Sequence, residues 1–137
     1  SLKIPELKYL LNNFISNNNT IIMYLIQDQK KETIAYIENM MILDTNHEHV
    51  IGILIGDCFF GHNKKVVGKI INQTVYLLSG EIVGKVELNQ SYKSTNIKKS
   101  LMVEAWDFLM NINEHTAAWI ETTKKWSKTP FLSCLTN

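Results

Sequence analysis

A 16-residue repeat in the middle of the chain is the feature that most restricts how this sequence can fold. Four blocks align without a gap when the chain is cut after Tyr36, Gly52, Gly68 and Gly84. They read IIMYLIQDQKKETIAY, IENMMILDTNHEHVIG, ILIGDCFFGHNKKVVG and KIINQTVYLLSGEIVG. Each block holds two short apolar runs around a polar turn, which is typical of a β-hairpin. Runs of this length suit strands of about five or six residues.

The last position of the second, third and fourth blocks is a glycine: Gly52, Gly68 and Gly84. A glycine inside a β-branched strand costs stability unless another backbone approaches closely or the strand kinks there. Its recurrence in three copies indicates a crowded place that the repeats share, such as an axis of rotational pseudosymmetry. The strand over residues 50–55 is apolar on both faces, so it needs cover from other elements.

Apolar residues at helical spacing predict helices on both sides of the repeats. Residues 4–16 carry one apolar stripe of an amphipathic helix. Residues 95–126 are predicted to form a helical segment that Thr95 caps and that breaks or kinks near its middle. Pro130 is expected to end any helix, which leaves residues 127–137 as an apolar tail.

Length and composition predict one domain over residues 1–137, because a chain of this size buries a sufficient core. The hairpin repeats between predicted helices make its expected class α+β. The 14 basic residues are all lysine and face 13 acidic ones. The lack of arginine and of a basic excess argues against a nucleic-acid binder. No apolar run reaches the roughly 18 residues of a transmembrane helix. Cys58 and Cys134 are expected to be buried thiols of a cytoplasmic protein, although a signal peptide removed before Ser1 would be invisible.

The aligned blocks resemble the four-fold β-flower domain over residues 21–88. The matching segments are residues 33–37, 50–53, 66–69 and 82–85, together with the strand entries 42–44 and 74–76. In that family, hairpins of this size are arranged like petals around a pseudo-four-fold axis. The resemblance implies a bacterial module of poorly defined function and supplies no catalytic residues. The first block departs from the pattern, since Tyr36 stands where the later blocks have glycine.

Three histidines close to two of the turns raise the hypothesis of a metal site. His47 and His49 are two residues apart, so on a strand both would point to one face, and His62 follows on the next turn. With Asp44 as an oxygen ligand, this set suits zinc or nickel. The alternative interpretation, that these side chains are solvated hairpin tips, is preferred, and no cofactor is expected.

Other candidate chemistry is interpreted as structural. Cys58 occupies a core position of its strand, and a buried apolar thiol is inert. His115 is interpreted as a surface or packing residue, and the lysine pairs as solvated faces. The sequence contains no Gly-rich phosphate loop, no serine nucleophile elbow and no paired-cysteine zinc motif.

The sequence therefore favours a non-catalytic binding or protein-interaction module that self-associates or takes a protein partner, with a small ligand as an option. Trp106 and Trp119 are the candidate partner-binding residues of the helical segment. One alternative is a small metal-dependent enzyme that uses His47, His49 and His62. Another is a small-ligand carrier whose pocket is lined by Phe59, Phe60, Tyr76 and Trp106.

Overall fold

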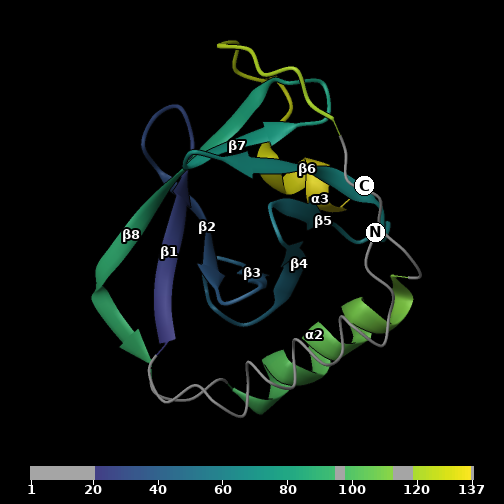
Figure 1. Ribbon diagram of the computed structural model, residues 1–137. Coiled ribbons are helices and arrows are strands. Elements are labelled where there is room, and N and C mark those ends of the chain that lie inside the picture. The colour runs from purple at the N-terminus through teal and green to yellow at the C-terminus, as the bar shows by residue number, and fades with distance from the viewer. Residues whose placement is uncertain (1–20, 95–97, 113–118, 137) are drawn as a thin grey trace.

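A computed structural model describes residues 21–94, 98–112 and 119–136 of the chain. Eight antiparallel strands follow one another as a meander and close into a barrel, because the first strand also pairs with the last (Figure 1). The strands are β1 (Ile21–Gln27), β2 (Thr33–Glu38), β3 (Met41–Leu43), β4 (Val50–Ile55), β5 (Cys58–Phe60), β6 (Val66–Ile71), β7 (Thr74–Leu77) and β8 (Ile82–Ser94). With two helices in the described residues, the fold agrees with the predicted α+β class.

The two ends of the barrel carry different kinds of turn. At one end, four turns each contain a residue of positive φ at Lys31, His47, Lys64 and Gly80. The N–H of each of these residues donates to the carbonyl oxygen three residues earlier, at 3.0, 3.1, 3.1 and 2.9 Å respectively. The other end carries two-residue turns at positions 39–40, 56–57 and 72–73. We call these the tip end and the far end of the barrel.

The three repeat glycines occupy matching positions in the strand pairing. Gly52 pairs with Ile42, Gly68 with Phe59 and Gly84 with Val75, each beside a β-bulge. A Cβ on Gly52 would lie 2.8 Å from the carbonyl oxygen of Phe60, and one on Gly84 would lie 2.6 Å from Cγ2 of Ile26. The close approach that the sequence predicted therefore leaves no room for a side chain.

In the first block the matching position is Ala35 and not Tyr36. Ala35 pairs with Ile26 beside a bulge of the same kind, which leaves Ile34 as the extra residue. Tyr36 instead pairs with Leu25 and packs against apolar side chains between the barrel and α2 (Lys99–Asn111). The gapless alignment is wrong by one residue here, because the second hairpin contains one residue more than the others. Gly52 follows its partner Ile42 by ten residues, whereas the matching residue of each other hairpin follows its partner by nine.

An inner cluster of apolar side chains fills the barrel. Its members come from strands on opposite sides of the closed sheet, so they meet only in the interior. They are Ile26, Ala35, Ile37, Ile42, Phe59, Val75, Val83 and Val86, with Phe131 and Leu135 from α3 (Phe131–Thr136).

The short helix α3 covers part of the tip end. The ring of Phe131 meets that of Phe59 edge to face, with centroids 5.6 Å apart. The carbonyl oxygen of Leu135 accepts a hydrogen bond from the N–H of His62 at 2.7 Å. The segment that the sequence predicts as an apolar tail is thus a short helix that packs on the barrel. Pro130 precedes this helix, where a residue without an N–H is tolerated.

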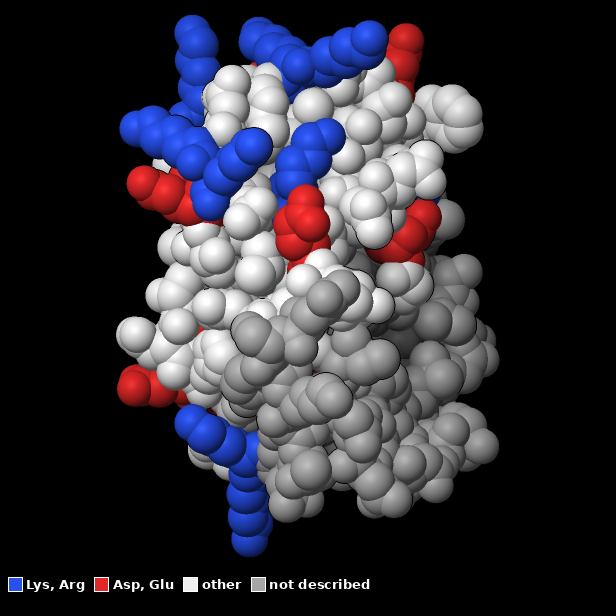
Figure 2. All heavy atoms as spheres, turned by 90° about the vertical axis from the view of Figure 1, so that its left-hand side faces the viewer, with Lys and Arg blue, Asp and Glu red and all other residues white. Residues whose placement is uncertain are grey.

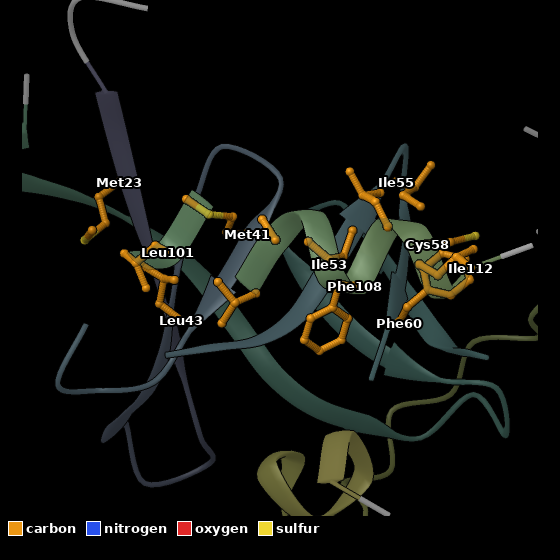
Figure 3. Close-up of a cluster of buried hydrophobic side chains, with 13 residues drawn as sticks. Met23, Met41, Leu43, Ile53, Ile55, Cys58, Phe60, Leu101, Phe108 and Ile112 are labelled. Atoms are coloured by element: carbon orange, nitrogen blue, oxygen red, sulfur yellow. The ribbon is translucent and has the colours of Figure 1, made fainter. Parts of the chain in front are cut away.

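An outer cluster lies between the outside of the barrel and α2 (Lys99–Asn111). Figure 3 shows side chains of β3, β4 and β5 pointing toward those of the helix. The strands contribute Met23, Met41, Leu43, Val50, Ile53, Ile55, Cys58 and Phe60, and the helical part contributes Leu101, Ala105, Phe108, Leu109 and Ile112. This packing provides the cover that residues 50–55 required.

The predicted helical segment over residues 95–126 is confirmed only in α2. Residues 119–126 are not helical, because their backbone instead hydrogen-bonds to the barrel beside β8. The predicted helix over residues 4–16 lies outside the described residues. Neither described helix is long and apolar enough to cross a membrane.

Candidate functional site

A groove of about 610 Å³ opens at the tip end, between the β1–β2 turn and the segment that leads into α3. Its apolar lining includes Ile34, Val83, Trp126 and Phe131. Ile34 and Val83 are bulge residues of β2 and β8, and with Phe131 they belong to the inner cluster or pack against it. The volume is that of a small-molecule site, for which roughly 300–1,000 Å³ is usual.

One wall of the groove is the β1–β2 turn, which its own hydrogen bonds hold in place. Oδ1 of Asp28 accepts from the backbone N–H groups of Lys30 and Glu32, both at 2.9 Å. The N–H of Asp28 donates to the carbonyl oxygen of Glu32 at 2.9 Å, and Lys31 adopts the left-handed φ of 65°. An aspartate that bonds to the backbone ahead of it is a common way to fix a turn.

The opposite wall is the segment before α3, which is attached to β8. The N–H of Ile82 donates to the carbonyl oxygen of Lys125, and the N–H of Ser127 donates to that of Ile82, both at 2.8 Å. The N–H and the hydroxyl of Thr123 both donate to the carbonyl oxygen of Gly80 at 3.0 Å. These bonds fix the backbone on each side of Trp126, so the protein's own hydrogen bonds hold both walls in place.

The rim of the groove is polar and carries charges of both signs. Lys30 and Glu32 lie on the turn wall, while Lys128 and the hydroxyl residues Ser127 and Thr129 lie on the other. Lysine side chains gather at the upper end of the face shown in Figure 2. Among the described residues, neither Lys30 nor Lys128 lies within ion-pair distance of a carboxylate.

The structure does not bring the three predicted metal-ligating histidines together. The ring of His47 meets that of Tyr36 at 4.2 Å between centroids, and the ring of His62 lies 5.3 Å from that of Phe108. Nδ1 of His49 lies 2.8 Å from Oε1 of Glu104 on α2. Within the described part of the chain, no three His, Cys, Asp or Glu side chains are placed to hold a metal ion. Each imidazole contacts a different partner at the edge of α2 or of the barrel.

Two of these histidines have shifted pKa values of opposite direction. The hydrogen bond to Glu104, and then the charge of that carboxylate, raise the pKa of His49. Burial, and then the charge of Lys98, lower the pKa of His47, although Asp44 partly opposes this effect. Glu104 also accepts from the N–H of Val50 at 2.6 Å, so it joins α2 to the start of β4.

The predicted aromatic lining residues do not surround one cavity. Phe59 lies inside the barrel and Phe60 lies under α2, on opposite faces of β5. Trp106 packs against the outer cluster, while Trp119 is 90% exposed. Tyr76 is half-buried on β7. The carrier hypothesis therefore has the wrong lining residues. The interior of the barrel is itself filled by apolar side chains.

The prediction of buried thiols holds fully for Cys58 and only in part for Cys134. Cys58 is 1% exposed in the outer cluster, and Cys134 is half-buried on α3, where burial raises its pKa. His115 lies outside the described residues. Asp57, next to Cys58, is exposed in a two-residue turn.

The sequence does not predict the groove, although two of its apolar lining residues occupy recurring positions of the repeat. Ile34 and Val83 belong to the β-branched positions that precede Ala35 and Gly84, so their recurrence was visible. Trp126 and Phe131 lie in segments for which the sequence predicts a helix and a tail, and no local pattern places them over the barrel end.

Comparison with known proteins finds no match to the chain among protein-family models, curated proteins or solved structures.

Proposed function

We propose that this chain is a non-catalytic binding module that holds a small ligand in the groove at the tip end. The observation that carries the proposal is an apolar floor that continues into the inner cluster between two hydrogen-bonded walls. A ligand there would bury apolar surface against Ile34, Val83 and Phe131, and rim groups would orient its polar part. Because the walls are tied to the barrel, little conformational entropy would be lost on binding.

We further propose that the barrel consists of four copies of one hairpin around a common axis, as in the four-fold β-flower domain. The matching bulge positions at Ala35, Gly52, Gly68 and Gly84 support this arrangement. The helix α3 then makes the copies unequal. It lies beside β4 and the β5–β6 turn, where Leu135 approaches Gly52 and Gly61. The groove lies where this helix leaves the tip end uncovered, above Ile34 of β2 and Val83 of β8.

Filling the groove with a large side chain tests the proposal. Thr129 is exposed and lines the groove, so Thr129→Trp should obstruct it without disturbing the core. Thr122→Trp is the matched control, because Thr122 is exposed on the same segment but does not line the groove. In ligand-observed NMR with a fragment library, we expect hits for the wild type and for Thr122→Trp that Thr129→Trp loses. A library without hits, or hits that Thr129→Trp retains, would reject the groove as a ligand site.

A second candidate function is self-association through the far end of the barrel. Tyr24 and Leu88 pair across β1 and β8 and are 39% and 46% exposed, and Tyr24 also pairs with the buried Ile37. An exposed apolar patch of this kind suits an isologous dimer contact with a second copy. Light scattering after size exclusion should give a dimer that Leu88→Lys dissociates and Glu87→Lys, on the adjacent exposed residue, does not. A monomer at high concentration would exclude this candidate.

A further inference from the structure

We infer that the groove at the tip end selects a small amphipathic anion, in which an apolar ring or short chain carries one carboxylate or similar group. This inference rests on the proposed function, since it names the chemical class of the ligand for the same groove. It follows from the separation of an apolar floor from a rim on which, among the described residues, the unused hydrogen-bond donors outnumber the one carboxylate, that of Glu32, without a side-chain hydrogen bond.

The donors come from both walls. Lys30 and Lys128 are exposed, and neither forms an ion pair among the described residues. The hydroxyl oxygen of Ser127 accepts from the N–H of Thr129 at 3.0 Å, which leaves its proton available to a ligand. Thr129 adds a second hydroxyl group to the same wall. An anionic group between the walls would therefore meet two ammonium groups and two hydroxyl donors.

The carboxylates at the rim weaken this preference less than their number suggests. Oδ1 of Asp28 already accepts two backbone hydrogen bonds, so part of its negative charge is compensated within the turn. Glu32 is exposed on the same turn and is the one acidic lining residue without a comparable side-chain bond. The apolar part of the ligand would lie against Ile34, Val83 and Phe131, below these groups.

Three probes that share one ring system separate charge from apolar contact. They are 2-naphthoate, 2-naphthylmethanol and 2-naphthylmethylammonium, titrated by calorimetry at low and high salt. We expect 2-naphthoate to bind most tightly and the ammonium compound most weakly, with the advantage of the anion reduced by salt. Equal or tighter binding of the ammonium compound would overturn the inference.

Variants locate the charge preference in the groove. Lys30→Gln and Lys128→Gln should each weaken 2-naphthoate binding by about two- to five-fold, which is the range for one exposed ion pair. They should leave 2-naphthylmethanol binding unchanged. Glu32→Gln should strengthen 2-naphthoate binding, and Lys99→Gln on α2 is the control that should have no effect. Unchanged 2-naphthoate binding in both lysine variants would overturn the inference.

The same measurements distinguish the two levels of proposal. If fragments bind the wild type and are lost in Thr129→Trp while none of the naphthalene probes binds, the ligand class is wrong and the binding module stands. If the fragment library gives no hits and no probe binds, both proposals fail.

Discussion

Gly68 on β6 lies directly against the ring of Phe59 on β5, with which it pairs. A Cβ on this glycine would sit 2.8 Å from Cζ of the ring and would also collide with the carbonyl oxygen of Tyr76. Phe59 is fully buried and is among the largest side chains of the inner cluster. The barrel therefore accommodates a phenyl ring at its centre because the neighbouring strand has no side chain at this position.

Gly68→Ala should destabilise the barrel by about 1–3 kcal/mol, the usual cost of adding a methyl group to a packed core. Urea denaturation followed by circular dichroism measures the change. Gly56→Asn is the control, because Gly56 has a φ of +62° and no atom within 4 Å of an added Cβ, and asparagine tolerates this backbone conformation. Equal stability of the wild type and Gly68→Ala would show that the crowding is relieved without cost.

Phe131→Ala should destabilise the protein by about 3–5 kcal/mol, because it removes a buried ring that packs on Phe59 at the tip end. Phe131→Leu, which keeps most of the volume, should cost less and remains measurable if the alanine variant does not fold. Leu132→Ala affects a neighbour that is 42% exposed, and we expect a change of about 0.5 kcal/mol or less. A similar denaturation midpoint for Phe131→Ala and Leu132→Ala would contradict a stabilising contribution from the packing of the Phe131 ring.

The pair of His49 and Glu104 should make stability depend on pH. Because the carboxylate raises the pKa of His49 from its ordinary value of 6.5, the protonated imidazole stabilises the folded state. This contribution is complete below the ordinary pKa and is lost as the pH rises through the raised one. His49→Gln should therefore lower the free energy of unfolding more at pH ~5.5 than at pH ~8.5. His62→Gln is the comparison, since His62 contacts the ring of Phe108 and not a carboxylate. If His49→Gln lowers the free energy of unfolding by the same amount at both pH values, the pair does not make stability depend on pH.

Glu38 should oppose folding once it ionises. Glu38 is only 3% exposed. Burial raises the pKa of its carboxyl group above the ordinary value of 4.5, and the charge of Lys98 partly opposes this shift. A carboxyl group whose pKa is raised on folding costs stability as the pH rises through that window. Glu38→Gln should therefore raise the melting temperature at pH ~7.5, with the gain shrinking toward pH ~4. The exposed Glu87→Gln should show no such trend, and a loss of stability in Glu38→Gln at pH ~7.5 would reverse the interpretation.

The hairpins could be predicted because their determinants are local. Apolar runs of strand length and turn residues recur at a fixed spacing, so positions such as Asp44 and Gly80 fall in turns before any long-range contact is considered. The surroundings of the three histidines could not be predicted, for the opposite reason. His47, His49 and His62 are close in sequence, but whether their rings converge depends on which neighbour each turn packs against, and that neighbour is α2 or Tyr36.

The amino-acid sequence by itself determined the strands, their order and the crowded glycine positions, because hydrophobic period and turn chemistry act over a few residues. Only the tertiary structure decided that β1 pairs with β8 and that Phe131 covers the tip end. It also decided that Trp126 stands across a groove from Lys30. These contacts join residues far apart in the chain, and burial of apolar surface selects them without leaving a local pattern.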